Sequence, residues 1–194
     1  GNSAEYVYGE AGDDLIYAST ALTSTDLVDG GEGNDTLALA AATHTLIAKG
    51  IENVKVGHTT IATTVNFTSI DSSVAITDSG AANVTFGNLL KGSTYTSTVA
   101  KTGALNLGFK ANEAATINVD LQKGTNGSIT LTNVADATVT LGAASNVATG
   151  ISLDKTATKL TVNATGNATI KDVLAGTIGN TTTEEKLATI AVTG

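Results

Sequence analysis

Residues 26–39 read DLVDGGEGNDTLAL, and this stretch decides the fold that we expect for the chain. Residues 29–35 alone contain three glycines and three acidic residues. Glycine allows the backbone conformations that tight turns require, whereas carboxylates held close together repel each other unless a cation neutralises them. The stretch therefore predicts a turn that binds a cation supplied from outside the chain.

This acidic stretch belongs to a series of nine-residue units. Residues 30–38 match G-G-x-G-x-D-x-U-x at every specified position, where U is a large apolar residue, and residues 9–17 match except that Glu10 replaces the second glycine. Weaker copies cover residues 1–8 and 21–29. In each unit the first six residues should turn and the last three should form a short strand that points the U residue inward. These inward residues are Val7, Ile16, Val28 and Leu37.

Charge separates the chain into two parts. Residues 1–48 contain eight acidic residues and no lysine, which accounts for the whole net charge of −8, and residues 49–194 contain ten acidic residues and ten lysines. Such a one-sided block repels itself unless counterions are bound. The chain has no arginine and no basic patch, which argues against nucleic acid as a partner.

The second part, residues 49–194, is rich in threonine and has no proline, a composition that favours strands. Apolar residues recur in alternating pairs, most of them 8 to 12 residues apart, which predicts an all-β array. A β-solenoid and a β-sandwich both fit this spacing, and we favour the solenoid because aromatics are only 4% of the chain. The core should then consist of Val, Ile, Leu and Ala. We also expect a short helix around residues 183–188. The expected pairs are Val74 and Ile76, Val84 and Phe86, Leu105 and Leu107, Ile117 and Val119, Ile129 and Leu131, Val139 and Leu141, Ile151 and Leu153, Leu160 and Val162, Ala168 and Ile170, and Ile190 and Val192.

The nine-residue units resemble the repeat of RTX proteins, which forms a calcium-loaded parallel β-roll. Two units make one coil, and three extra residues, Ala18 to Thr20, separate the second unit from the third. The turns that begin at Gly9 and Gly30, 21 residues apart, should therefore stack on one edge of residues 1–48. The resemblance implies Ca²⁺ as the cofactor, held by alternate carbonyls and the aspartate of each turn. The implied ligands are Gly9, Ala11, Asp14, Gly31, Gly33 and Asp35, with Asp26 and Glu5 forming a weaker site on the opposite edge. The alternative is a pair of hairpin turns with solvated carboxylates, which does not explain the in-phase apolar residues.

The RTX units, the threonine-rich strand array and the absence of cysteine together resemble the calcium-dependent surface-layer (S-layer) proteins that Gram-negative bacteria export by type I secretion. The resemblance implies an extracellular protein of the bacterial cell surface that self-assembles into a lattice and contacts outer-membrane lipopolysaccharide. We expect the sequence to be a fragment of a longer polypeptide. The chain departs from the family in one respect, since the family's repeats usually lie near the C-terminal secretion signal, whereas residues 39–194 follow them here.

Other functional classes have weaker support. A large secreted RTX adhesin could use the roll as a calcium-stiffened module, and Thr-x-Thr steps at residues 130–132 and 138–140 would fit an ice-binding solenoid if they recurred regularly. His44 and His58 fall in no metal or catalytic motif, and the chain has no cysteine nucleophile, so we expect no enzyme activity. The chain has no apolar run long enough for a transmembrane segment.

Overall fold

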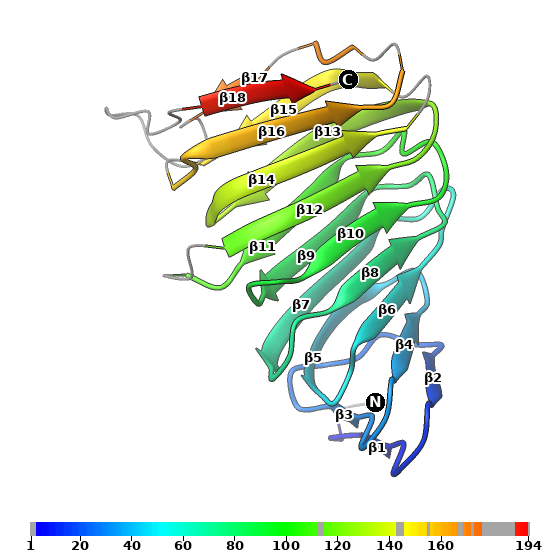
Figure 1. Cartoon of the computed structure of the whole chain (residues 1–194). Coiled ribbons are helices and arrows are strands. Elements are labelled where there is room, and N and C mark those ends of the chain that lie inside the picture. Colours follow the sequence, from blue (N-terminus) through cyan, green and yellow to red (C-terminus); the bar gives the residue numbers. More distant parts are fainter. Residues whose placement is uncertain are drawn as a thin grey trace.

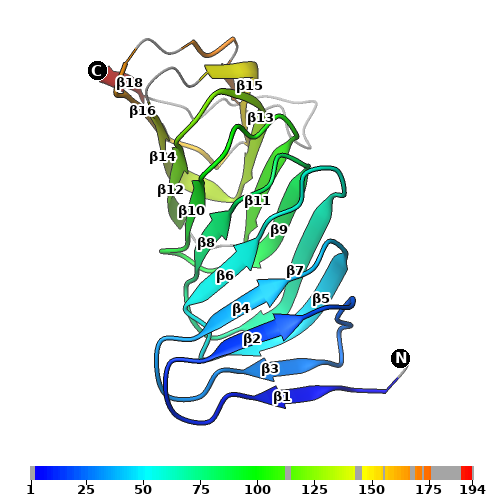
Figure 2. The same ribbon diagram turned by 90° about the vertical axis from the view of Figure 1, so that its right-hand side faces the viewer.

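The fold is a stack of short parallel strands in two facing sheets (Figures 1 and 2). The computed structural model describes residues 3–111, 115–142, 146–154, 156–166, 169–171, 173–175 and 189–193. Every strand pairing in these ranges is parallel, and they contain no helix. The predicted β-solenoid is therefore confirmed, and the sandwich alternative is excluded because sandwich sheets are antiparallel.

In the part of the chain that the structure describes, each sheet has nine strands, and the chain alternates between the two sheets. The odd-numbered sheet contains β1 (Tyr6–Tyr8), β3 (Leu27–Asp29), β5 (Thr43–Lys49), β7 (Thr63–Ile70), β9 (Val84–Leu89), β11 (Leu105–Phe109), β13 (Thr125–Thr132), β15 (Asn146–Leu153) and β17 (Val173–Ala175). The even-numbered sheet contains β2 (Leu15–Ala18), β4 (Thr36–Leu39), β6 (Asn53–Val56), β8 (Ala75–Asp78), β10 (Thr94–Ser97), β12 (Ala115–Leu121), β14 (Val134–Leu141), β16 (Lys159–Ala164) and β18 (Thr189–Thr193).

The first coils have the predicted register. Val7 pairs with Val28 in one sheet and Ile16 pairs with Leu37 in the other, so the first coil consists of two nine-residue units and the three extra residues 18–20. The sheets continue through residues 48 and 49 without interruption, because β5 pairs with both β3 and β7, and β6 pairs with both β4 and β8. The acidic part and the threonine-rich part therefore share one stack (Figure 1).

Inward residues of the two sheets form one continuous apolar core. Our expectation of a purely aliphatic core is wrong, because Phe67, Phe86, Phe109 and Tyr95 are all buried. The core opens at the N-terminal end, where Val7 is 37% exposed because no earlier coil in the described residues covers it.

The C-terminal predictions have a mixed outcome. Residues 189–193 form β18, which contains the expected pair Ile190 and Val192. Ile170 makes an isolated bridge to Val147, and the next strand, β17, begins at Val173. Ala168 and the proposed helix at residues 183–188 lie outside the described residues.

Candidate metal centre

Two glycine-rich turns stack directly at one edge of the solenoid. Residues 9–14 connect β1 to β2, and residues 30–35 connect β3 to β4 one coil further on. The Gly12 N–H donates to the Glu32 carbonyl at 2.7 Å, and the Glu32 N–H donates to the Glu10 carbonyl at 2.8 Å. The 21-residue spacing thus brings the two turns together as predicted.

Glycine is required in the second turn because the two backbones approach so closely. Gly31 has φ +94°, and a Cβ atom there would collide with the Glu10 carbonyl. Gly33 has φ +144°, and its Cβ would collide with the Gly12 carbonyl. Glu10, which replaces a glycine of the repeat, adopts φ +73°, a conformation that costs a non-glycine residue about 1–2 kcal/mol.

Three carboxylates lie one above another at this edge. Asp35 Oδ1 accepts the Asp14 N–H at 2.8 Å, and Glu52 Oε2 accepts the Asp35 N–H at 2.8 Å. We call Asp14, Asp35 and Glu52 the carboxylate column. Sequence analysis missed Glu52 because the turn before β6, residues 50–52, is shorter than the turn of residues 30–35. Each residue of the column nevertheless lies two positions before an inward apolar residue. Those inward residues are Ile16, Leu37 and Val54.

The column contains two oxygens that lack a partner. Asp14 Oδ2 and Asp35 Oδ2 are buried and accept no hydrogen bond in the described structure. A buried acceptor without a donor costs about 1–3 kcal/mol, and more when it is charged. A cation between the coils would remove this cost, so the residues fit the metal that the sequence predicts.

The predicted backbone ligands have free carbonyls. Hydrogen bonds between the two turns use the carbonyls of Glu10 and Glu32, and none of those described uses the carbonyls of Gly9, Ala11, Gly31 or Gly33. In the described residues, no group of three or more His, Cys, Asp or Glu side chains is placed to hold a single metal ion. A cation here would therefore be held largely by carbonyl oxygens, which is a donor set that suits a hard cation such as Ca²⁺.

The opposite edge holds Asp26, which already has partners on both oxygens. Its Oδ1 accepts the Glu5 N–H at 2.8 Å, and its Oδ2 accepts the Thr23 N–H at 2.6 Å. Burial disfavours the charged form, but the hydrogen bonds from Thr23 and Glu5 hold the pKa of Asp26 below its usual value. Asp26 therefore caps the backbone of this edge, and its weaker metal site with the exposed Glu5 stays a prediction.

Replacing Asp26 with asparagine should lower the free energy of unfolding by about 1–3 kcal/mol at pH 7, because the amide nitrogen would face the Thr23 donors. A lowered pKa means that the carboxylate stabilises the fold above about pH 4 and loses this effect as pH falls through its folded-state pKa. The difference in the free energy of unfolding between wild type and variant, measured by urea denaturation, should therefore narrow below pH 4. A constant difference from pH 7 to pH 3 would contradict this role.

A second polar group, which sequence analysis missed, lies inside the solenoid. Asp78 Oδ2 pairs with Lys101 Nζ at 2.6 Å and accepts the Tyr95 hydroxyl at 2.7 Å, and both charged side chains are at most 3% exposed. Asp78 Oδ1 accepts the Gly80 N–H at 2.8 Å. Burial and the adjacent Asp78 charge raise the pKa of Tyr95 far above its usual value. The group connects successive coils at the edge opposite the carboxylate column.

The histidines have structural partners. His44 is fully buried, accepting the Leu22 N–H at Nδ1 and donating from Nε2 to the Ala40 carbonyl, and His58 Nε2 lies 3.3 Å from the Leu39 carbonyl.

The threonine steps form no regular array. Thr130 lies between Asn106 and Ser152 in one sheet, and Thr140 lies between Asp120 and Asn163 in the other. A regular threonine column, which ice binding would favour, is thus interrupted at these positions.

The fold and the turns define a two-sheet parallel β-solenoid with stacked carboxylates along one edge. Comparisons with protein-family models, curated proteins and solved structures find no match. The described residues include no helix able to span a membrane.

Proposed function

We propose that this chain is part of a structural S-layer subunit, located on the bacterial cell surface after export by type I secretion. Its subunits assemble into a lattice in a calcium-dependent manner. The observation that carries the proposal is the pair of buried oxygens between the stacked turns, Asp14 Oδ2 and Asp35 Oδ2, for which the described residues supply no donor. The resemblance of the nine-residue units to RTX repeats supplies the cell-surface context.

Calcium acts as a switch for folding. Residues 1–48 carry eight acidic residues and no lysine, and their short strands bury little apolar surface, so they remain disordered at the low calcium concentration of the cytosol. Millimolar calcium outside the cell fills a site of the weak extracellular class and stabilises the folded roll. The ordered roll then provides the first coils on which the following strands stack.

Exposed apolar side chains on the first coil support contacts between subunits. Tyr6, Tyr8, Leu15 and Tyr17, on β1 and β2, are 61–68% exposed. Concentrated exposed apolar surface commonly marks an interaction site. Outer-membrane lipopolysaccharide is the second proposed partner, because calcium can bridge two anionic surfaces.

The switch is tested by circular dichroism and light scattering of the intact parent protein during a calcium titration. Strand signal and assembly should rise together near millimolar calcium and reverse when a chelator is added, whereas magnesium at equal concentration controls for ionic strength. Complete assembly in chelator would overturn the calcium-gated function.

Electron microscopy of the parent protein separates the lattice from the adhesin. A two-dimensional array with calcium supports the S-layer subunit. Separate extended particles would favour the adhesin, in which the solenoid serves as a stiff spacer.

A further inference from the structure

The carboxylate column extends one coil beyond the nine-residue repeats. Glu52 lies in the short turn of residues 50–52, between β5 and β6, yet it contacts the Asp35 N–H as Asp35 contacts the Asp14 N–H. The column ends there, because the residue in register in the next coil is Val74. The Val74 N–H is capped instead by Ser93 Oγ at 3.1 Å. Three stacked carboxylates therefore enclose two gaps between coils.

Each gap contains one unpartnered carboxylate oxygen and one glycine carbonyl. In the first gap, Asp14 Oδ2 lies 2.7 Å from the position that a Cβ of Gly9 would occupy, and the Gly30 carbonyl oxygen contacts the same position. In the second gap, Asp35 Oδ2 and the Gly50 carbonyl oxygen contact the corresponding position at Gly30.

The oxygens of the second gap need a neutralising partner at least as much as those of the first. Asp35 is fully buried, with 0% exposure, and its Oδ2 has no donor in the described structure. Neither glycine carbonyl accepts any of the described backbone hydrogen bonds. Oxygen acceptors placed together without a donor repel each other, and the low dielectric of a buried site strengthens the repulsion.

We propose that the column binds two divalent cations, one in each gap, and that the second is held by Asp35, the Gly50 carbonyl and Glu52. This inference rests on the proposed calcium function, but it adds a site completed by a turn that does not match the repeat. The second cation would connect the acidic coils to the neutral solenoid. Its binding would therefore couple the folding of residues 1–48 to the strands that follow.

The test is isothermal titration calorimetry of the full chain with calcium chloride. Wild type should bind one calcium ion in each gap, in addition to any ion at the weaker Asp26 site. Glu52→Gln keeps an oxygen that can accept the Asp35 N–H but removes the charge, so it should weaken the second site at least tenfold and leave the first unchanged. Asp14→Asn should weaken the first site. Asp120→Asn, on the outer face of β12, is the matched control and should change neither.

The outcomes separate this inference from the proposed function. One calcium per wild-type chain, with Glu52→Gln unchanged, would overturn the second site and leave the first. No binding to wild type would overturn both. A wild-type stoichiometry of one overturns the second site without any substitution. Two calcium ions that both survive Glu52→Gln overturn it as well, because they would then lie in the first gap and at the weaker Asp26 site.

Discussion

Replacing Lys101 with methionine is expected to lower the free energy of unfolding by about 3–5 kcal/mol, because Asp78 would remain as an uncompensated charge in the core. The Asp78 and Lys101 side chains are 1% and 3% exposed, and their charged atoms lie 2.6 Å apart. Lys101 Nζ also donates to the Gly80 carbonyl at 3.2 Å, so the substitution frees a second buried acceptor. Urea denaturation followed by circular dichroism measures the loss.

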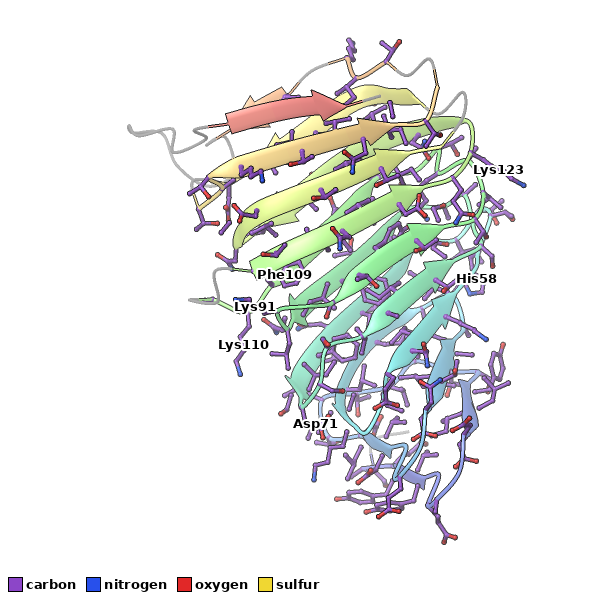
Figure 3. The ribbon with its side chains drawn as sticks, viewed as in Figure 1. His58, Asp71, Lys91, Phe109, Lys110 and Lys123 are labelled. Atoms are coloured by element: carbon purple, nitrogen blue, oxygen red, sulfur yellow. The ribbon has the colours of Figure 1, made fainter. Side chains whose placement is uncertain are left out.

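Two further variants distinguish charge from side-chain volume. Lys110→Met alters an exposed lysine whose side chain points away from the solenoid, and it should change stability by less than about 0.5 kcal/mol (Figure 3). Asp78→Asn combined with Lys101→Met removes both charges and should recover much of the loss. A Lys101→Met variant as stable as wild type would show that the buried pair does not stabilise the fold.

Sequence periodicity predicted the parts of the fold in which each coil repeats the same local pattern. Val7, Ile16, Val28 and Leu37 occupy the inward position of their units, and the glycines and aspartates beside them set the turn length. Because two units and the three extra residues 18–20 make the first coil, the stacking of the first two turns followed directly from the 21-residue spacing. The local sequence pattern and the long-range strand pairing indicate the same structure here, which is why a single sequence is enough to predict the first coils.

Strand β10 shows where periodicity fails. Its inward residues are Tyr95 and Ser97, which replace the usual apolar pair, so its sequence TYTS gives no clear core signal. Tyr95 is buried because Asp78 from the preceding coil accepts its hydroxyl. That partner comes from tertiary stacking, which no local pattern in β10 encodes.

The metal centre was predictable only in part for the same reason. Asp14 and Asp35 belong to the repeat, whereas Glu52 is the last residue of a turn, residues 50–52, that is three residues shorter than the turn of residues 30–35. The shorter turn shifts Glu52 out of the expected spacing, although stacking restores its contact with Asp35. The Asp78 and Lys101 pair had no sequence signal, since it joins two isolated charges from successive coils, one at the end of β8 and one in the loop after β10.

Replacing Gly33 with alanine is expected to abolish the first calcium site in the roll. Gly33 has φ +144°, which is strained for alanine, and the new Cβ would collide with the carbonyl of Gly12 in the adjacent turn. The backbone strain alone costs about 1–3 kcal/mol. The collision adds to this cost because the two turns must move apart, which separates the oxygens on either side of the first gap.

Gly12→Ala is the matched control for this prediction, because Gly12 holds the same position in the earlier turn. Gly12 has φ +119°, but its Cβ would meet no atom within 4 Å, so the substitution introduces strain without a collision. Strain of about 1–3 kcal/mol in the folded turn corresponds to a 5- to 150-fold loss of calcium affinity. Calorimetry should show Gly33→Ala losing at least tenfold more affinity than Gly12→Ala. Equal losses in the two variants would mean that close stacking of the turns is not what forms the site, and that glycine is needed there for its backbone conformation alone.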